Sequence, residues 1–421
     1  MGRKVWWIGL LATFMSAGAF ARDISGDWQG VLKVGGQESR LIVRIKKDHG
    51  GWKATVLPID YSGDWGLEVP ANSVTLAGSH LKITIAAGGA IYEGTVSTDG
   101  NSVAGIWTQG QSQPLDCRRA TKKTAWQHPS PHAVRFVAVE NNVRVEVLDW
   151  GGNGRPVVLL TGLGSTAHVF DKFALSLVGT YHVYGITRRG FGASSVPTSG
   201  YAADRLGDDV LAVLDALKIS RPVLIGHSIA GEELSSVGSR HPETVAGLIY
   251  LDAGYSYAYY DSSRGDFVID SRELQRQLEQ LQPGKESADR KQLIAELLET
   301  SLPRFERELR ELQQTDVPEQ APSAPFQAIV AGAQKYTTIR VPILAIFADP
   351  HDPGPSVGSD SAASTAFEAR DKATMNAITK AFESGLPSAR VVRLPHASHN
   401  IYVSNEADVL RETKTFIGTL P

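Results

Sequence analysis

Apolar and polar residues alternate along most of the chain between residues 22 and 120. The alternation is clear at residues 40–46, 81–85 and 91–96, and turn sequences such as Asp48-His49-Gly50-Gly51 separate the runs. A period of two residues with turns at short intervals predicts antiparallel β-strands. Roughly eight such runs are present, which is enough for a small sandwich or a closed barrel. We therefore expect an all-β domain over residues 22–120.

The pattern changes after a polar, proline-containing segment at residues 121–131, which we interpret as a linker. A β-hairpin is expected at residues 135–149, and short apolar runs then alternate with segments of helical periodicity. The apolar runs are residues 157–160, 183–186, 223–225, 248–251, 343–347 and 391–394. Continuous apolar runs are typical of strands buried on both faces, so residues 132–421 are predicted to form a mostly parallel sheet covered by helices, an α/β fold.

A stretch between two of these strands has a helical pattern of its own. From about residue 255 to 335 apolar residues recur at helical spacing, as Leu274, Leu278 and Leu281 do, among many charged residues. We expect a helical insertion here.

The first residues have the pattern of a secretory signal peptide. Arg3 and Lys4 precede an apolar run at residues 5–18, and Ala19-Phe20-Ala21 supplies small residues before a cleavage point. The alternative is a membrane anchor, but the run is shorter than the ~20 residues that a spanning helix needs. We predict cleavage after Ala21, export to the periplasm or the medium, and no membrane span in the mature protein.

Composition narrows the possible partners and cofactors. The 421 residues carry a formal net charge of −3, which gives no basic excess for binding nucleic acid. The single cysteine, Cys117, excludes an intramolecular disulfide and a cysteine-rich metal site. The apolar content predicts stabilisation by packed cores.

The segment Gly226-His227-Ser228-Ile229-Ala230-Gly231 joins the predicted strand 223–225 to a predicted helix through residues 234–239. A serine on a tight strand-to-helix turn has an exposed hydroxyl, and the turn needs small neighbours. Because a serine hydroxyl is a weak nucleophile, it needs a histidine base and an acid that orients this base. This pattern predicts Ser228 as a nucleophile.

The motif resembles the nucleophile elbow G-x-S-x-G of the α/β-hydrolase superfamily, with Ala230 in place of the second glycine. The sequence Leu394-Pro395, followed shortly by His399 and an expected C-terminal helix, also looks like the catalytic-histidine loop of that family. The resemblance implies His399 as the general base, with His396 as the alternative, and a helical cap at about 255–335 over the active site. It also implies catalysis without a metal or an organic cofactor.

The acid is less clearly defined by the resemblance. The family order places it between the serine and the histidine. We favour Asp352, which lies in the loop after the strand at 343–347, although its spacing departs from the family pattern by about one residue. Asp349 in the same loop and Asp252, directly after the strand at 248–251, are the alternatives.

The same resemblance places an oxyanion hole at two backbone amides. Residues 161–165, Thr-Gly-Leu-Gly-Ser, follow the first strand of the parallel run, where the family carries its oxyanion loop. The amides of Leu163 and Ile229 are therefore expected to form the hole.

Together these features predict an exported serine hydrolase that acts on a small-molecule carboxylic ester. Amide, lactone and carbon–carbon bond hydrolysis use the same triad and stay open as alternatives. A hydrolase fold without activity, serving as a binding protein, is the alternative of another class. The β domain resembles small lipocalin-like domains that precede the hydrolase domain in some bacterial proteins.

Overall fold

A computed structural model describes residues 23–34, 37–48, 50–58, 69–85, 89–121, 132–282, 289–313, 324–353 and 361–421. These residues form two compact units, one within the part up to residue 121 and the other from residue 132 onward. The predicted signal peptide and nearly all of the predicted linker lie outside the described residues and stay predictions. No helix within the described ranges has both the length and the hydrophobicity required to cross a bilayer.

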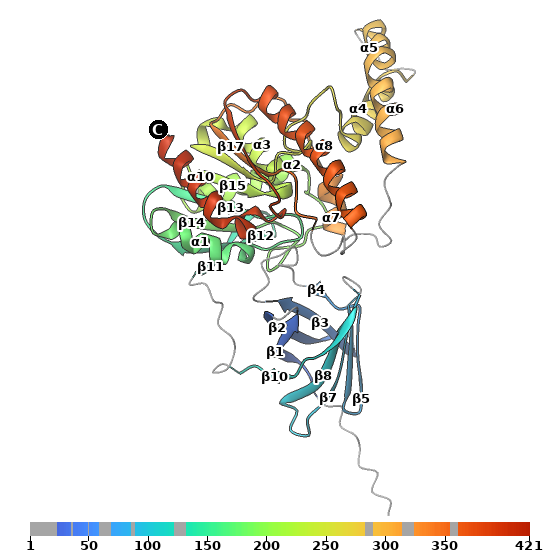
Figure 1. Ribbon diagram of the computed structural model, residues 1–421, viewed down its shortest axis with the longest axis vertical. Helices are drawn as coiled ribbons and strands as arrows, with labels where there is room; N and C mark the ends of the chain where they lie inside the picture. The colour runs from blue at the N-terminus through green and yellow to red at the C-terminus, as the bar shows by residue number, and fades with distance from the viewer. Residues whose placement is uncertain are drawn as a thin grey trace, which may run out of the picture. The chain divides into compact units, whose positions relative to one another are not determined.

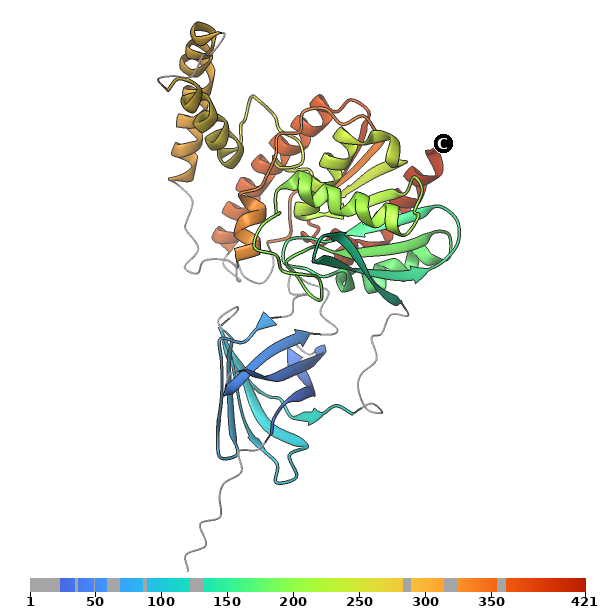
Figure 2. The same ribbon diagram turned by 180° about the vertical axis from the view of Figure 1, so that it is seen from behind.

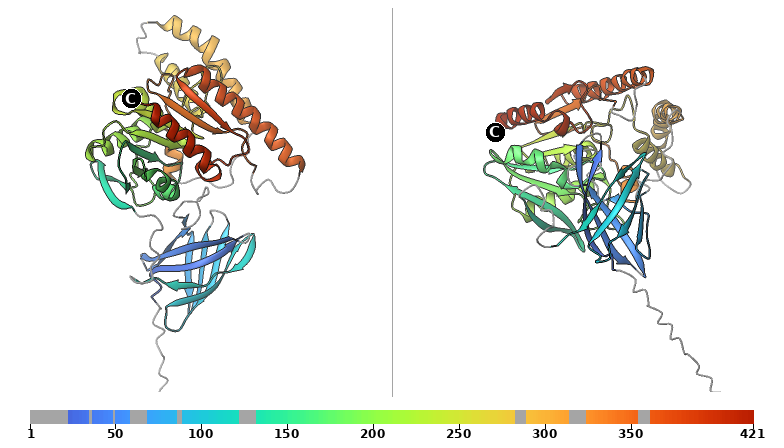
Figure 3. Two further views of the ribbon diagram at one scale, coloured as in Figure 1. Left: turned by 60° about the vertical axis from the view of Figure 1, so that its left-hand side comes forward. Right: turned by 60° about the horizontal axis from the view of Figure 1, so that its bottom comes forward.

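The N-terminal unit is an antiparallel sheet that curls into a nearly closed barrel (Figure 3). Its strands follow the order β4-β3-β2-β1-β10-β8-β7-β6-β5, with β9 paired to β8, and β3 and β5 lie in contact near the two ends of this order. The strand bounds are β1 Gly26–Val34, β2 Gln37–Asp48, β3 Gly51–Pro58, β4 Val69–Pro70, β5 Ser73–Ala77, β6 His80–Ile85, β7 Ala90–Val96, β8 Ser102–Gln109, β9 Gln111–Pro114 and β10 Cys117–Arg119. The predicted β domain is confirmed.

Alternation along the strands fills the interior of this barrel. In β6 the apolar residues Leu81, Ile83 and Ile85 are buried, whereas the intervening side chains are less so. Trp28 is also buried, its indole N–H donates to the carbonyl of Ile24, and Cys117 is a free, buried thiol.

The second unit is built on an eight-stranded sheet in the order β11-β12-β14-β13-β15-β16-β17-β18. The first two strands pair antiparallel, as do β12 and β14, and the rest of the sheet is parallel. The strand bounds are β11 Ala133–Glu140, β12 Val143–Gly151, β13 Pro156–Leu160, β14 His182–Thr187, β15 Val223–His227, β16 Gly247–Leu251, β17 Ile343–Ala348 and β18 Ala389–Leu394. The predicted α/β fold with a mostly parallel sheet is confirmed.

Two apolar cores cover the two faces of this sheet. In β13, Val157 and Leu159 belong to one core with side chains of α1 and α10, whereas Val158 and Leu160 belong to the other with side chains of α2, α3 and α8. Figures 1 and 2 show these two helical layers from opposite sides. Burial on both faces explains why the strands are continuous apolar runs.

The helices of this unit, including three short turns and one π-helical turn, have the following bounds. They are η1 Ala167–Phe170, α1 Asp171–Val178, α2 Ala203–Ala216, η2 Ser228–Ala230, α3 Gly231–Arg240, η3 Pro242–Thr244, α4 Phe267–Gln280, α5 Arg290–Glu296, η4 Leu297–Ser301, α6 Leu302–Leu312, α7 Ala324–Val330, α8 Ser361–Gly385, α9 Ile401–Ser404 and α10 Glu406–Thr419.

The predicted helical insertion lies between β16 and β17. Helices α4, α5 and α6 pack together as an arm, which Figures 1 and 2 show in yellow and orange. An ion pair of 2.9 Å between Arg304 of α6 and Asp270 of α4 ties the arm together, and the hydroxyl of Tyr260 donates to the same carboxylate. Helices α4, α5 and α6 confirm the predicted helical character of the insertion.

Candidate active site

The serine at the end of β15 sits on a strained turn. Ser228 has a φ of +52°, a left-handed conformation that residues with a side chain rarely adopt. The chain passes from β15 through the short turn η2 directly into α3, so the first amides of that helix surround the serine. Ser228 therefore occupies the nucleophile elbow predicted from the sequence.

The structure also shows why alanine is tolerated at the second glycine position of the elbow. The methyl group of Ala230 is fully buried in an apolar core. The position without space is the next one, since a Cβ on Gly231 would lie 2.0 Å from the carbonyl oxygen of Ala253. In this elbow the close approach that demands glycine lies at Gly231.

His399 lies in the loop between β18 and α9, and its ring reaches a buried carboxylate. Its Nδ1 is 2.6 Å from Oδ2 of Asp252, which directly follows β16 and has no exposed surface. The side chain of His399 is 35% exposed, so the other ring nitrogen remains accessible for proton transfer. His396, the alternative base, is exposed.

The aspartate that bonds His399 is therefore Asp252 and not the favoured Asp352. The segment after β17 runs beside the loop of His399, with His351 bridged to Ala397 and the amide of Asp352 donating to the carbonyl of Ala397. Neighbouring side chains of an extended segment point to opposite sides, so His351 faces Asp252 while Asp352 is exposed. The other alternative, Asp349, forms an ion pair of 3.3 Å with Arg393.

The carboxylate of Asp252 accepts hydrogen bonds from four donors. They are Nδ1 of His399 at 2.6 Å, Nε2 of His351 at 2.7 Å, the hydroxyl of Tyr255 at 3.2 Å and the amide of Ala348 at 3.1 Å. Burial alone would raise the pKa of Asp252, but the hydrogen bonds from His351 and His399 outweigh it and lower the pKa to about 2. Asp252 is therefore an anion at neutral pH.

A buried histidine, His227, holds the loop of His399 in place. Nε2 of His227 donates to the backbone carbonyl of His399 at 3.0 Å, and the two rings lie 4.7 Å apart. Burial, followed by repulsion from His399, lowers the pKa of His227 to about 3, so this imidazole is neutral. His227 is thus a structural partner of the histidine loop.

The predicted oxyanion loop lies beside the serine. A Cβ on Gly162 would be 3.5 Å from that of Ser228, and Leu163 packs on the same apolar cluster as Ile229. The guanidinium of Arg188 donates to the carbonyls of Thr161 and Gly162 and pairs at 2.6 Å with the buried Glu233 of α3. This buried pair fixes the loop against the elbow helix.

Tyr257, from the start of the insertion, also reaches the serine. Its side chain is partly buried, its phenol interacts with the hydroxyl of Ser228, and desolvation raises its pKa well above the ordinary range. Tyr257 and Tyr255, whose hydroxyl bonds Asp252, come from the tyrosine-rich segment that follows β16. The sequence indicated a pocket-lining role at most for Tyr257 and no role for His351, because neither belongs to a recognisable motif.

Two groups of side chains in the described ranges bring potential metal ligands within 4.8 Å of one another. They are His132, His168 and Asp171, and Asp252, His351 and His399. In the second group both histidines bond the same oxygen of Asp252, at 2.6 and 2.7 Å. This convergence on one acceptor favours a hydrogen-bonded network over a metal centre.

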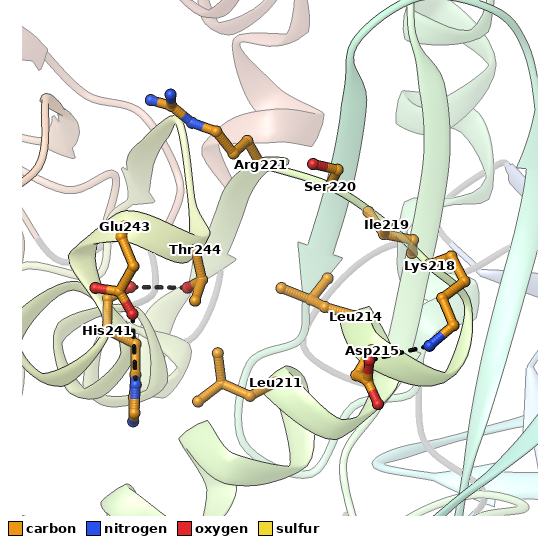
Figure 4. A pocket seen from close by; sticks show the side chains of 10 residues that line it. All are labelled: Leu211, Leu214, Asp215, Lys218, Ile219, Ser220, Arg221, His241, Glu243 and Thr244. Atoms are coloured by element: carbon orange, nitrogen blue, oxygen red, sulfur yellow. Dashed lines mark hydrogen bonds and ion pairs between the residues drawn. The ribbon is translucent and has the colours of Figure 1, made fainter.

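A cavity of about 570 Å³ lies elsewhere on the second unit (Figure 4). It is lined by residues of α2 and by the segments that lead into β15 and β16, including Arg221 and Thr244. Ser228 and Asp252 follow the carboxyl ends of the same two strands. Ligands of open α/β sheets bind at the carboxyl ends, so this cavity is not the active site.

Comparisons with known proteins agree with the fold. A family model of the alpha/beta hydrolase fold matches residues 155–406. The non-heme chloroperoxidase of Streptomyces lividans is 32% identical over 28% of this chain and 44% of its own length. The 2-(acetamidomethylene)succinate hydrolase of Mesorhizobium japonicum is 25% identical over 24% of this chain and 36% of its own length. The bifunctional esterase/perhydrolase DCH of Acinetobacter calcoaceticus is 29% identical over 28% of this chain and 44% of its own length.

The chain thus spans about two fifths of the length of the curated relatives it matches. Among solved structures, the esterase of Exiguobacterium antarcticum is 17% identical, with a TM-score of 0.45, and the match covers 68% of this chain and all of the other. An N-acyl homoserine lactone degrading enzyme is 22% identical, with a TM-score of 0.42, over 67% of this chain and all of the other. With most of its second unit matched by the family model, this chain belongs to the alpha/beta hydrolase fold family.

Proposed function

We propose that this protein is an exported serine hydrolase that cleaves carboxylic esters of small molecules, with Ser228, His399 and Asp252 as its catalytic triad. One observation carries the proposal: His399 is hydrogen-bonded to the fully buried carboxylate of Asp252, and its loop is bonded by His227, the residue directly before the strained Ser228. A nucleophile, an accessible base and an orienting acid are the three groups that acyl transfer requires.

In the proposed mechanism each group has one role. Ser228 attacks the ester carbonyl carbon while Nε2 of His399 takes the hydroxyl proton, and Asp252 stabilises the imidazolium through Nδ1. The amides of Leu163 and Ile229 donate to the oxyanion. His399 then gives the proton to the leaving alcohol, and a water molecule, activated by the same histidine, attacks the acyl-enzyme and releases the acid.

Esters are the proposed substrate class because two of the similar proteins are an esterase/perhydrolase and an esterase. Other relatives are a chloroperoxidase and a 2-(acetamidomethylene)succinate hydrolase, so perhydrolysis and amide hydrolysis form the second candidate function. Export rests on the basic and apolar pattern of residues 1–21.

The test is hydrolysis of p-nitrophenyl esters of graded acyl length by the chain beginning at Arg22. We expect turnover that is lost in Ser228→Ala and His399→Ala, with the chain-length profile reporting the size of the acyl pocket. A folded protein that turns over no ester would refute the ester assignment. Export is tested separately by determining where the protein accumulates and what its N-terminal residue is. A protein outside the cytoplasm that begins at Arg22 confirms export, and a cytoplasmic protein that still carries residues 1–21 contradicts it.

An inactive binding protein is the alternative of another class. A fluorophosphonate, which phosphonylates activated serines, separates the two readings, because a scaffold without a working triad leaves the probe unreacted.

A further inference from the structure

A second histidine, His351, bonds the acid of the proposed triad. His351 follows β17, and its Nε2 lies 2.7 Å from Oδ2 of Asp252, the same oxygen that His399 bonds. The centroids of the two imidazole rings are 6.0 Å apart. Asp252 is therefore held between two histidines.

The other edge of His351 meets a second carboxylate. Both its Nδ1 and its backbone amide are bonded to Asp371 of α8, at 3.1 and 2.7 Å. The structure thus contains a continuous chain of four side chains, in the order Asp371, His351, Asp252 and His399. With an acceptor at each ring nitrogen, His351 has to carry two protons to satisfy both bonds, and a doubly protonated imidazole is a cation.

The charges around His351 favour this cationic form. Burial disfavours it, but the hydrogen bond and the charge of Asp252, together with the charge of Asp371, outweigh burial and raise the pKa of His351 to about 9. Within the described part of the chain, the ring of His399 also faces it, and the hydroxyl of Tyr255 bonds the same acceptor oxygen.

We propose that His351 is a positioning residue that fixes Asp252 for His399 and, as an imidazolium, balances the charge of that carboxylate. This inference rests on the proposed function, because it concerns the base of the same triad. Its consequence is that His399 bonds a carboxylate whose charge is already balanced on its other side by His351. A cation 6.0 Å away opposes a further positive charge in the site, so we expect activity to extend to lower pH than it would without His351.

The backbone around His351 supports the positioning role. His351 forms a parallel bridge to Ala397, and the amide of His396 donates to the carbonyl of Pro350 at 2.8 Å. The segment that carries His351 is therefore joined to the loop that carries His399. One residue links α8, the acid and the histidine loop.

The experiment measures how the rate of inactivation by a fluorophosphonate, and kcat/KM for an ester, depend on pH in the wild type and in His351→Gln. Removing the cation removes an unfavourable charge beside the site, so we expect the acid limb of the pH–rate profile to move to higher pH. Coulomb's law for a unit charge 6.0 Å away, with an effective dielectric constant between 80 and 20, gives a shift of about 0.5 to 2 pH units. The matched control is His396→Gln, the same change at an exposed histidine near His399, for which we expect no shift.

A uniform fall in rate with an unchanged acid limb would overturn the charge role of His351, since loosened packing lowers the rate at every pH alike. A wild-type protein that does not react with the probe would instead refute the proposed function. The two failures are thereby distinguishable.

If His351→Gln does not fold, the protonation state of His351 can be measured with this residue in place. In ¹⁵N-histidine spectra at pH 7.5 we expect His351 and His168 as imidazolium ions, because the carboxylates of Asp171 and Glu146 outweigh burial and raise the pKa of His168 to about 9 as well. The variant His168→Gln identifies the signal of His168, and the absence of an imidazolium signal from His351 would overturn the inference.

Discussion

Replacing Asp252 by asparagine tests the acid of the proposed triad at constant side-chain size. All four of its partners are donors, so the amide group of an asparagine faces at least one of them in either orientation. If the NH2 group of the asparagine points toward His399, Nδ1 of His399 has to accept a hydrogen bond. The ring proton then moves to Nε2, where it blocks proton transfer from Ser228. If the NH2 group points toward Ala348, it opposes the backbone N–H of Ala348 in a buried site.

The expected loss of kcat in Asp252→Asn follows from the wrong tautomer of His399. The corresponding substitution in a serine protease lowers kcat by about 10⁴-fold, which is about 5.5 kcal/mol of transition-state stabilisation. We expect a loss of this order in kcat for Asp252→Asn and an acyl pocket that is left intact, so KM should change little.

The assay is ester hydrolysis near neutral pH, with circular dichroism to establish that each variant is folded. Asp352→Asn is the matched control, because Asp352 is exposed and we expect its variant to keep the wild-type rate within about twofold. Asp252→Asn with more than a tenth of the wild-type kcat would refute the assignment, as would a larger loss in Asp352→Asn.

Three further changes test other parts of the site and the insertion. Gly231→Ala should abolish labelling by a fluorophosphonate and lower the melting temperature, because the new Cβ would lie 2.0 Å from the carbonyl of Ala253; wild-type labelling would contradict this. Arg188→Met leaves Glu233 buried without its partner, so we expect a loss of about 3 to 5 kcal/mol in the free energy of unfolding by urea, and a loss below about 1 kcal/mol would contradict the structural role of the pair. Burial, together with the neighbouring Asp270, raises the pKa of Glu308 from 4.5 to about 8. Between these pH values the folded state binds a proton that the unfolded state has released, so stability should fall as pH rises from 4.5 to about 8 and level off above it, and Glu308→Gln should flatten this fall in melting temperature.

Hydrophobic patterning predicted the architecture well because burial determines it. The strands of the parallel sheet are buried on both faces, as Val157 to Leu160 show, and such runs are visible in the sequence. The barrel strands follow a period of two for the same reason.

The site was only partly predictable. Ser228 and His399 stand in motifs, but three aspartates follow strands at the same edge of the sheet. The direction of the side chains in the segment after β17 turns His351 toward Asp252 and leaves Asp352 exposed, and no sequence pattern reports that direction. The roles of His351 and Tyr257 depend on contacts between residues far apart in the chain, so they needed the structure.

The central claim is that Ser228 is an activated nucleophile, and covalent labelling tests it most directly. The intact mature chain is treated with a fluorophosphonate and digested, and mass spectrometry identifies the modified peptide. The account predicts one adduct at Ser228, none in a folded Ser228→Ala variant and much slower labelling in Asp252→Asn than in Asp352→Asn. An adduct at another serine, or no adduct on the folded wild-type protein, would contradict it.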